Sequence, residues 1–248
     1  MLNRIILLLS ILVFLGAWQV ISMTDLPFIP SPQDVFTVIF FFNFWSDIAP
    51  DFFATLFRFF AAFIGAIILG VPLGLLTGYF YPLYKFLELP IDFFRAVPAT
   101  ALFPLFMLFF GIGDFSKTLL IIFSCSLIMM IHTISGVRHG VLLRRMAAKT
   151  MGANKLQIFS KVIFFDALPQ IFTGIKIVLS TCIIIVVVLE MFVGSKAGLG
   201  KKIYDFHLTY RIPYMYSVII IVGCLSYFLN RLFALLEKKV VHWQGKAG

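Results

Sequence analysis

The chain carries very little charge for its length. Only 12% of its 248 residues are Asp, Glu, Lys or Arg, whereas a typical soluble domain has about 25%. Hydrophobic residues make up 61%, and phenylalanine alone contributes 31 residues. A soluble domain of this length could not hide so much apolar surface and still present a wet exterior. The composition therefore excludes a soluble enzyme, a disordered protein and a nucleic-acid-binding protein. In a membrane protein, a net charge of +9 indicates an excess of Lys and Arg in the loops, and it does not indicate nucleic-acid binding.

Patterns of chemically reactive residues are missing as well. The sequence contains no H-E-x-x-H and no G-x-S-x-G motif, and its four histidines form no cluster. Its three cysteines fall in apolar runs without metal-ligand spacing, which is typical of small apolar side chains. Residues 194–202 match a phosphate-binding loop only in part, because Ser195 and Lys202 stand where that motif requires Gly and Ser or Thr. We therefore expect no catalytic residue, no metal site, no cofactor and no enzymatic activity.

Long runs without charge are what the sequence has instead. A helix needs about 20 mostly apolar residues to cross a bilayer. Six runs reach or approach this length: Ile5–Met23, Phe59–Tyr84, Ala96–Gly113, Thr118–Val137, Ile177–Leu189 and Ile212–Asn230. We predict an all-α, polytopic membrane protein with six transmembrane helices in a single domain, residues 1–248. The first run is interpreted as a helix and not as a cleaved signal peptide, because it continues through Val20 and Ile21 without a clear cleavage site.

The distribution of lysine and arginine predicts the orientation. With both termini in the cytoplasm, twelve of the 20 Lys and Arg residues fall in inside segments and five in outside segments. The last outer loop is a local conflict, because it carries Lys196, Lys201 and Lys202. We expect a multi-pass protein of the plasma (inner) membrane that contacts the lipid bilayer and no nucleic acid.

Two segments on the predicted outer side are not simple spans. Residues 24–58 form an outer loop, and within it Val35–Phe44 is apolar, too short to cross a bilayer and preceded by Asp34 as an N-cap. We expect this segment to be an interfacial helix. Residues 194–211 form a loop rich in glycine and lysine, which is interpreted as a flexible turn or a re-entrant piece.

Three glycines in the second run, Gly70, Gly74 and Gly78, repeat every four residues. Glycine at this spacing gives a flat stripe that lets another helix approach closely. The stripe is either a packing contact within the chain or a moving contact that lines the pathway. Pro72, between the first two glycines, is expected to kink the helix.

One acid, Glu190, lies deep in an apolar run, which makes it a candidate functional residue. It is either a gate or pathway residue or a member of an interfacial salt bridge, for which Lys196, Lys201 and Lys202 are the near lysines. His132, late in the fourth run, either faces a polar cavity or donates to a backbone carbonyl.

Residues 138–170 form a long basic segment on the predicted inner side. Gly152 is expected to end one helix, and Asn154 with Gln157 is a capping-box pattern that starts another at Lys155. This second helix carries apolar side chains next to its lysines: Leu156, Ile158, Phe159, Val162 and Ile163. Such a helix either docks on a partner or lies on the membrane surface, where lysines contact anionic lipid.

At this segment the sequence resembles the EAA loop of ABC importer permeases. Met146-Ala147-Ala148, Gly152 and Val162 follow the spacing of that loop. The closer match is to the nitrate/sulfonate/taurine-type permeases. Their motifs recur in order along the chain as Leu26-Pro27, Pro30-Ser31-Pro32, Gly70-Val71-Pro72-Leu73-Gly74, Arg95-Ala96-Val97-Pro98, Phe110-Gly111-Ile112-Gly113, Lys117, Ala167-Leu168-Pro169, Glu190-Met191 and Gly198-Leu199-Gly200.

The resemblance implies a type I ABC importer permease (MetI-like) fold and transport by alternating access. It implies a homodimer or another paired permease, a separate cytoplasmic ABC ATPase dimer and an extracytoplasmic solute-binding protein. The implied ATPase-coupling residues are Ala147, Ala148, Gly152, Ala153, Asn154, Lys155, Gln157 and Phe159. The candidate pathway or gate residues are Glu190, Met191, Pro98 and His132. The chain departs from the family at Met146, where the family has a bracing Glu, and at Phe165, where it has Pro.

Two other functions fit the sequence less well. A secondary transporter acting without an ATPase would show internal repeats and several intramembrane acids, whereas this chain has no convincing repeat and one such acid. An intramembrane enzyme would need the motifs that are absent. The sequence leaves the solute open between nitrate-, sulfonate- or taurine-like anions, bicarbonate and a heteroaromatic vitamin precursor.

Overall fold

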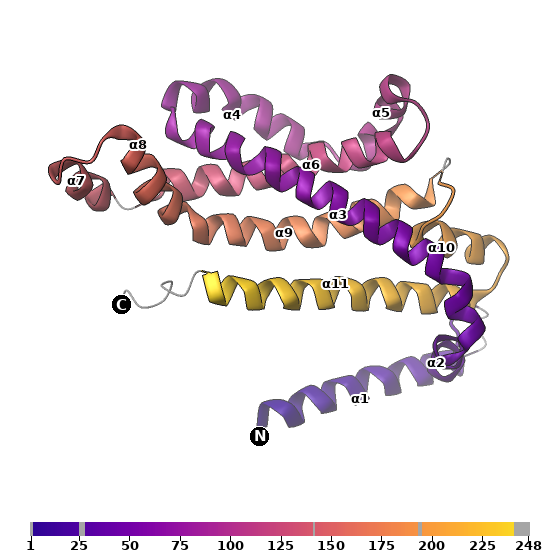
Figure 1. The fold of residues 1–248 in the computed structure, drawn as a ribbon. Helices are drawn as coiled ribbons and strands as arrows, with labels where there is room; N and C mark the ends of the chain where they lie inside the picture. Colours follow the sequence, from indigo (N-terminus) through magenta and orange to yellow (C-terminus); the bar gives the residue numbers. More distant parts are fainter. Residues whose placement is uncertain (1, 25–27, 141, 193–194, 241–248) are drawn as a thin grey trace. The chain divides into compact units, whose positions relative to one another are not determined.

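The computed structural model describes residues 2–24, 28–140, 142–192 and 195–240, which form helices and connecting segments without a strand (Figure 1). In chain order the elements are α1 (Leu2–Ser22), α2 (Pro32–Phe40), α3 (Phe42–Tyr79), α4 (Tyr81–Ala96), η1 (Ala99–Leu102), α5 (Phe103–Phe110), α6 (Asp114–Arg138), α7 (Leu142–Thr150), α8 (Lys155–Ile158), η2 (Phe159–Ile163), α9 (Phe164–Met191), α10 (Leu199–Leu208) and α11 (Ile212–Val240). The predicted all-α fold class is confirmed. The motif Leu26-Pro27 and residue 194 of the second outer loop lie outside the described residues.

The chain, expected to be one domain over 1–248, groups into two compact units. One consists of Met1–Thr55 with Glu190–Cys224, and the other of Leu56–Leu189 with Leu225–Gly248. Three helices, α3, α9 and α11, contain the points where the chain passes from one unit to the other.

The number of spanning helices differs from the six predicted. Four described stretches are long and apolar enough to cross a bilayer: Phe42–Tyr79, Asp114–Arg138, Lys155–Met191 and Ile212–Val240. A fifth is obtained when α4 and the segment Ala99–Phe110, bent by 93° at a short break, count as one broken span. The apolar stretch Leu9–Ser22 of α1 is shorter than these. Six spans are therefore not confirmed.

The third predicted span, Ala96–Gly113, was wrong as a single helix. Val97 and Pro98 both have extended backbones, so α4 ends at Ala96 and a short 3-10 turn, η1, begins at Ala99. Proline disfavours helical backbone in the residue before it and cannot donate a helical hydrogen bond. The apolar composition of this run is real, but its backbone is interrupted by Pro98.

The outer loop predicted over 24–58 is largely helical. Its first helix, α2, begins at Pro32 with Ser31 as the N-cap, and the Asp34 amide donates to Ser31 Oγ at 3.2 Å. Asp34 is therefore not the N-cap that the sequence suggested, because Pro32 is well suited to the first helical position and Ser31 to the cap before it. From Phe42 onward the predicted loop belongs to α3, which continues through Pro72 to Tyr79.

The 194–211 segment is also more ordered than a flexible turn. It contains the ten-residue helix α10, which follows Gly198 with φ of +145°. Leu199, Ile203 and Phe206 are buried on one side of α10 at helical spacing, and burial of this apolar stripe holds the helix in its unit.

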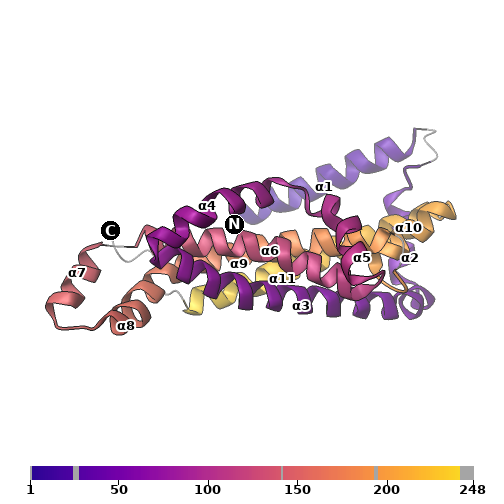
Figure 2. The same ribbon diagram turned by 90° about the horizontal axis from the view of Figure 1, so that it is seen from above.

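In the other unit, α3 packs closely on α6, and α6 on α9 (Figure 2). A Cβ atom placed on Gly70, Gly74 or Gly78 would lie 2.6–2.8 Å from the Cβ atoms of Met129, Thr133 and Val137 on α6. Gly136 of α6 meets the Ala167 backbone of α9 in the same way. The four-residue glycine repeat thus lets the backbone of α3 approach α6 more closely than residues with a Cβ atom would allow.

Replacement of Gly74 by alanine is expected to destabilise this unit by about 1–3 kcal/mol, because the new methyl group would overlap Thr133 and the Met130 carbonyl oxygen. The matched control is Gly223→Ala in α11, where no atom lies within 4 Å of the added Cβ. Thermal unfolding in detergent should show a lower Tm for Gly74→Ala only. An equal Tm for the two variants would contradict the close packing.

Candidate functional site

The loop between α6 and α9 has the predicted break and cap. α7 ends at Thr150, and Gly152 has φ of +82°, a conformation that favours glycine. The Gln157 amide donates to Asn154 Oδ1 and the Asn154 amide donates to Gln157 Oε1, both at 2.8 Å. These reciprocal bonds satisfy free amides at the start of α8 and fix its first residue at Lys155.

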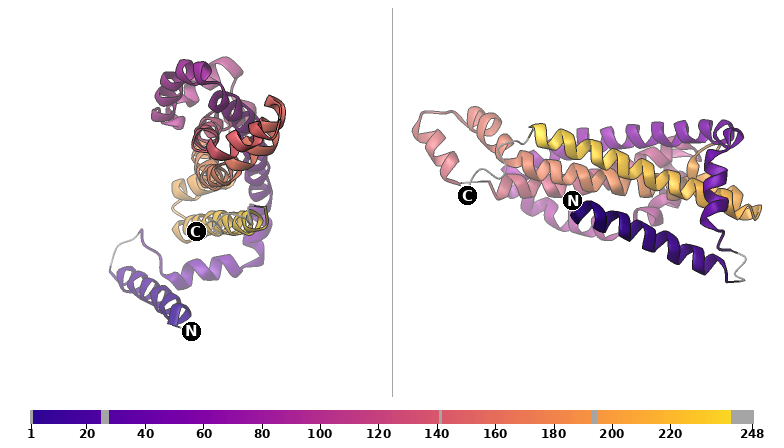
Figure 3. Two further views of the ribbon diagram at one scale, coloured as in Figure 1. Left: turned by 90° about the vertical axis from the view of Figure 1, so that its left-hand side faces the viewer. Right: turned by 90° about the horizontal axis from the view of Figure 1, so that it is seen from below.

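The helix that begins at Lys155 does not stop within the loop. α8 passes into η2, a π-helical turn, and then into α9, so one helical stretch runs from Lys155 to Met191. Figure 3 shows α7 and α8 beyond the ends of α6 and α9. Met151 and Leu156 are 86% and 74% exposed. This end of the unit therefore presents Leu156 on a capped helix and Met151 on the turn before it.

Two apolar residues that the sequence placed on the same surface pack against the unit. Ile163 is buried at 1% exposed, and the Phe159 ring lies 5.2 Å from the Tyr79 ring of α3 in an edge-to-face arrangement. Both side chains pack in this way because α8 and η2 continue the helix that belongs to this unit. Of the coupling residues inferred from the family, Lys155 and Gln157 are exposed and Phe159 is half-buried.

An ion pair that the sequence analysis missed ties α7 to α9. The Arg144 guanidinium donates to the Asp166 carboxylate, whose side chain is 7% exposed. The neighbouring Arg145 donates to the Val137 carbonyl oxygen at the end of α6. Met146, which stands where the family has its bracing Glu, is 57% exposed. Asp166, 22 residues after Arg144, is therefore the acid that pairs with this loop.

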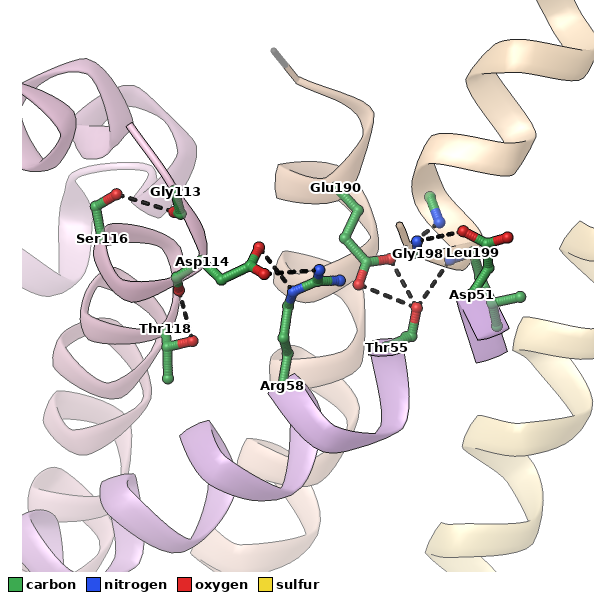
Figure 4. A network of polar contacts seen from close by, with 11 residues as sticks. Asp51, Thr55, Arg58, Gly113, Asp114, Ser116, Thr118, Glu190, Gly198 and Leu199 are labelled. Atoms are coloured by element: carbon green, nitrogen blue, oxygen red, sulfur yellow. Dashed lines mark hydrogen bonds and ion pairs between the residues drawn. The ribbon is translucent and has the colours of Figure 1, made fainter. Parts of the chain in front are cut away.

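A second cluster surrounds the buried acid Glu190 (Figure 4). Its side chain is 1% exposed and accepts hydrogen bonds from the Thr55 hydroxyl at 2.8 and 3.0 Å. The Gly200 amide at the start of α10 donates to Glu190 Oε2 at 3.0 Å. A buried carboxylate is costly unless several donors satisfy it, and these two groups provide part of that satisfaction.

The same cluster fixes the turn that leads into α10. The Gly198 amide donates to Asp51 at 2.6 Å, and the Leu199 amide donates to the Thr55 hydroxyl at 2.8 Å. A Cβ atom at Gly198 would lie 2.4–2.7 Å from the Glu190 carboxyl group. Glycine is required at this position both by its φ and by the carboxylate that fills the space beside it.

Lys202, one of the lysines considered for Glu190, pairs with other acids. Its Nζ lies 2.9 Å from Asp47 and 3.7 Å from Asp51. Asp47, Asp51 and Thr55 recur every four residues on α3, which places them on one face of the helix. That spacing was the available signal, but the two aspartates were assigned to a loop and Thr55 was overlooked.

In the other compact unit, the sequence analysis also missed a bidentate pair on α3. Arg58 is 5% exposed, and its Nε and Nη2 donate to the Asp114 carboxylate at 3.0 and 3.1 Å. The sequence analysis placed Arg58 at the boundary between the outer loop 24–58 and the run Phe59–Tyr84 and assigned no partner to it.

Of the remaining pathway candidates, Pro98 and His132 belong to this unit. Pro98 lines a cavity of about 280 Å³ at the break between α4 and η1, and His132 is not among its lining residues. His132 instead packs against Gly174 of α9. Met191 belongs with Glu190 to the other compact unit. Within the described residues, no group of three His, Cys, Asp or Glu side chains could hold a metal ion.

The chain is similar in sequence to known membrane transport proteins. Residues 70–242 match the model of a family described as binding-protein-dependent transport system inner membrane component. The chain belongs to this family. The permease is 29% identical to a probable ABC transporter permease of Brucella abortus, over 97% of this chain and 96% of that protein. It is 26% identical to the taurine transport system permease of Escherichia coli (96% and 89% covered) and 28% identical to the nitrate import permease of Synechocystis (94% and 87%).

Solved structures share its fold. A chain from inward-facing conformations of the MetNI methionine ABC transporter superposes with a TM-score of 0.68 at 20% identity, covering 78% of this permease and 96% of that chain. The predicted MetI-like importer permease fold is therefore confirmed. Its relatives are named as transport components, and the nitrate/sulfonate/taurine resemblance is confirmed by the relatives themselves.

Proposed function

We propose that this permease forms the membrane pathway of an ATP-driven importer and moves a small solute into the cytoplasm by alternating access. The observation that carries this proposal is the exposed, capped helix at Lys155–Ile158, which is continuous with the long helix α9. A rigid helix that starts outside the spanning segments transmits a push along its axis, because its backbone bonds resist compression.

The partners follow from the same surface. A cytoplasmic ABC ATPase dimer docks on the segment that contains Ala147, Ala148, Gly152, Ala153, Asn154, Lys155 and Gln157, with Met151 and Leu156 as the apolar contacts. Phe159 supports this surface from within through Tyr79. Two permease copies pair in the inner membrane with both termini in the cytoplasm, and a solute-binding protein delivers the solute outside. ATP hydrolysis takes place on the separate ATPase chain.

The solute belongs to the anions named for the relatives, which are permeases for taurine, aliphatic sulfonates, nitrate and bicarbonate. Each of these solutes bears an oxyanion group. The heteroaromatic precursor that the sequence left open has no counterpart among these names.

The test is reconstitution. The tagged permease is purified from membranes together with the ATPase that accompanies it, placed in proteoliposomes, and assayed for uptake of labelled taurine, aliphatic sulfonate, nitrate and bicarbonate. We expect uptake that requires ATP and the binding protein and that is abolished by an ATPase inhibitor. Uptake by the permease alone, driven by an ion gradient, would overturn the proposal in favour of the secondary transporter.

Asp166→Asn is expected to weaken coupling, because it removes the charge that holds Arg144 while preserving the size of the side chain. Breaking an ion pair with a buried acid costs up to about 3–5 kcal/mol, and the half-exposed Arg144 places this pair toward the lower end. ATPase stimulation by the loaded binding protein should fall severalfold. The exchange Arg144→Asp with Asp166→Arg should restore part of it, and no change in the single variant would contradict the bracing role.

A further inference from the structure

A cavity of about 280 Å³ lies at the break between α4 and η1. The names of the relatives assign no function to this cavity. Its walls come from residues 94–100, from α6 through Ser124 and Ile128, and from α9 through Thr181 and Ile185. Irregular backbone within a membrane protein persists only where it is buried in protein or lines a cavity, and broken helices often carry solute sites. The volume lies just below the range of about 300–1,000 Å³ for ligand pockets, which suits a small solute.

The hydroxyl groups on the walls are not committed elsewhere. Hydroxyls within helices normally donate back to a carbonyl one turn earlier, as Ser126, Thr133 and Thr173 do here at 2.8–3.0 Å. Thr100, Ser124 and Thr181 line the cavity, and none of their hydroxyls forms a hydrogen bond within the described chain. Three helical segments thus bring three residues with uncommitted hydroxyl groups to one cavity.

The charge on the walls has one sign. Arg95 is the basic residue there, and no acid is among the described lining residues. Arg95 Nε donates to Asp92 at 2.8 Å on the side of α4, which leaves four guanidinium N–H donors of the five. Asp92 offsets part of the Arg95 charge, and the four remaining guanidinium donors favour a ligand that accepts hydrogen bonds and carries negative charge.

We infer that this cavity is a solute subsite that binds an oxyanion group, sulfonate, nitrate or carboxylate, through Thr100, Ser124, Thr181 and Arg95. The inference rests on the proposed import function and gives its solute a place on the chain. Pro98 acts by interrupting the helix, since a continuous helix would fill the break. The apolar wall from Ile128 and Ile185 keeps the ligand contact weak enough for release.

The test uses thiol reagents as probes of the full complex. Ser124→Cys and Thr181→Cys are made in a chain whose Cys125, Cys182 and Cys224 are alanine. The complex is labelled with sulfonatoethyl methanethiosulfonate, an anion, and with trimethylammonioethyl methanethiosulfonate, a cation. Rates are divided by those for free cysteine in solution. Ser126→Cys, two residues away on α6, is the matched control, because Ser126 does not line the cavity and its hydroxyl donates to the Phe123 carbonyl oxygen.

We expect the anion to react severalfold faster than the cation at both positions, because the Arg95 charge is partly offset by Asp92 and acts across a partly wet site. Arg95→Gln should remove this preference and Arg95→Lys should retain much of it, while Ser126→Cys should react slowly with both reagents. Equal rates, a preference for the cation, or equal labelling of Ser126→Cys would overturn the inference. Because labelling requires no ATP, such a failure leaves the import function standing, whereas loss of ATPase co-purification from the unmodified permease would count against that function.

Discussion

A permease with Lys155→Glu and Leu156→Asp is expected to lose its ATPase while remaining folded in the membrane. Leu156 is 74% exposed and Lys155 is exposed beside it, so neither change disturbs internal packing. Burying a carboxylate in an apolar contact is unfavourable, and replacing a central interface residue costs about 2 kcal/mol or more, at least roughly 30-fold in affinity. Co-purification of the ATPase and ATP-dependent uptake should both fall by this factor or more.

The matched control is Lys155→Arg with Leu156→Met, which preserves charge and apolar size and should retain the ATPase. Phe159→Asp provides a second comparison, because its ring packs on Tyr79. That variant should lower the Tm as well as ATPase binding. Unchanged co-purification with Lys155→Glu and Leu156→Asp would remove the docking role from this helix and favour a helix that lies on the lipid surface.

Glu190→Gln is expected to lower transport about tenfold without lowering ATPase association. The Thr55 hydroxyl and the Gly200 amide both donate to Oε2, which the Gln carbonyl oxygen can replace, but the other oxygen, Oε1, becomes an NH2 group that donates and cannot accept from Thr55. An unpaired buried donor costs about 1–3 kcal/mol, which shifts a conformational equilibrium by a factor of about five to more than a hundred. Uptake in proteoliposomes and co-purification, measured on the same preparation, separate the two effects.

Lys202→Gln is the control for this cluster, because its ion pair with Asp47 is partly exposed. Exposed pairs contribute about 0–1 kcal/mol, so transport should change little. Wild-type transport by Glu190→Gln would leave Glu190 with a purely structural role.

The parts of the fold that sequence predicted well depend on neighbouring residues. The two residues of the capping box, Asn154 and Gln157, are only three positions apart. The glycines of α3 repeat every four residues, so they lie on one face of the helix. The all-α class follows from composition. In each case the residues themselves carry the physical cause, so no knowledge of the tertiary structure is needed.

The parts that the sequence did not predict depend on distant partners. Asp47 and Asp51 were assigned to a loop because charge argues against a span, yet Lys202 and the Gly198 amide bind them on α3. Asp166 holds Arg144 across 22 residues, and Asp114 holds Arg58 across 56. A charge can be placed correctly in a membrane protein only when its counter-charge is known, and spacing along the chain does not reveal it.

The π-helical turn η2 between Phe159 and Ile163 affects the direction of the proposed docking surface. A π-turn holds one residue more than an α-turn, and each residue of an α-helix advances by about 100° around the axis. Because the wider turn takes up the extra residue, removing one residue from η2 would leave Leu156 in nearly its present direction relative to α9. Removing one residue from the α-helical start of α9 would instead rotate Leu156 by about 100°. The proposed docking surface thus keeps its direction although the helix holds one extra residue.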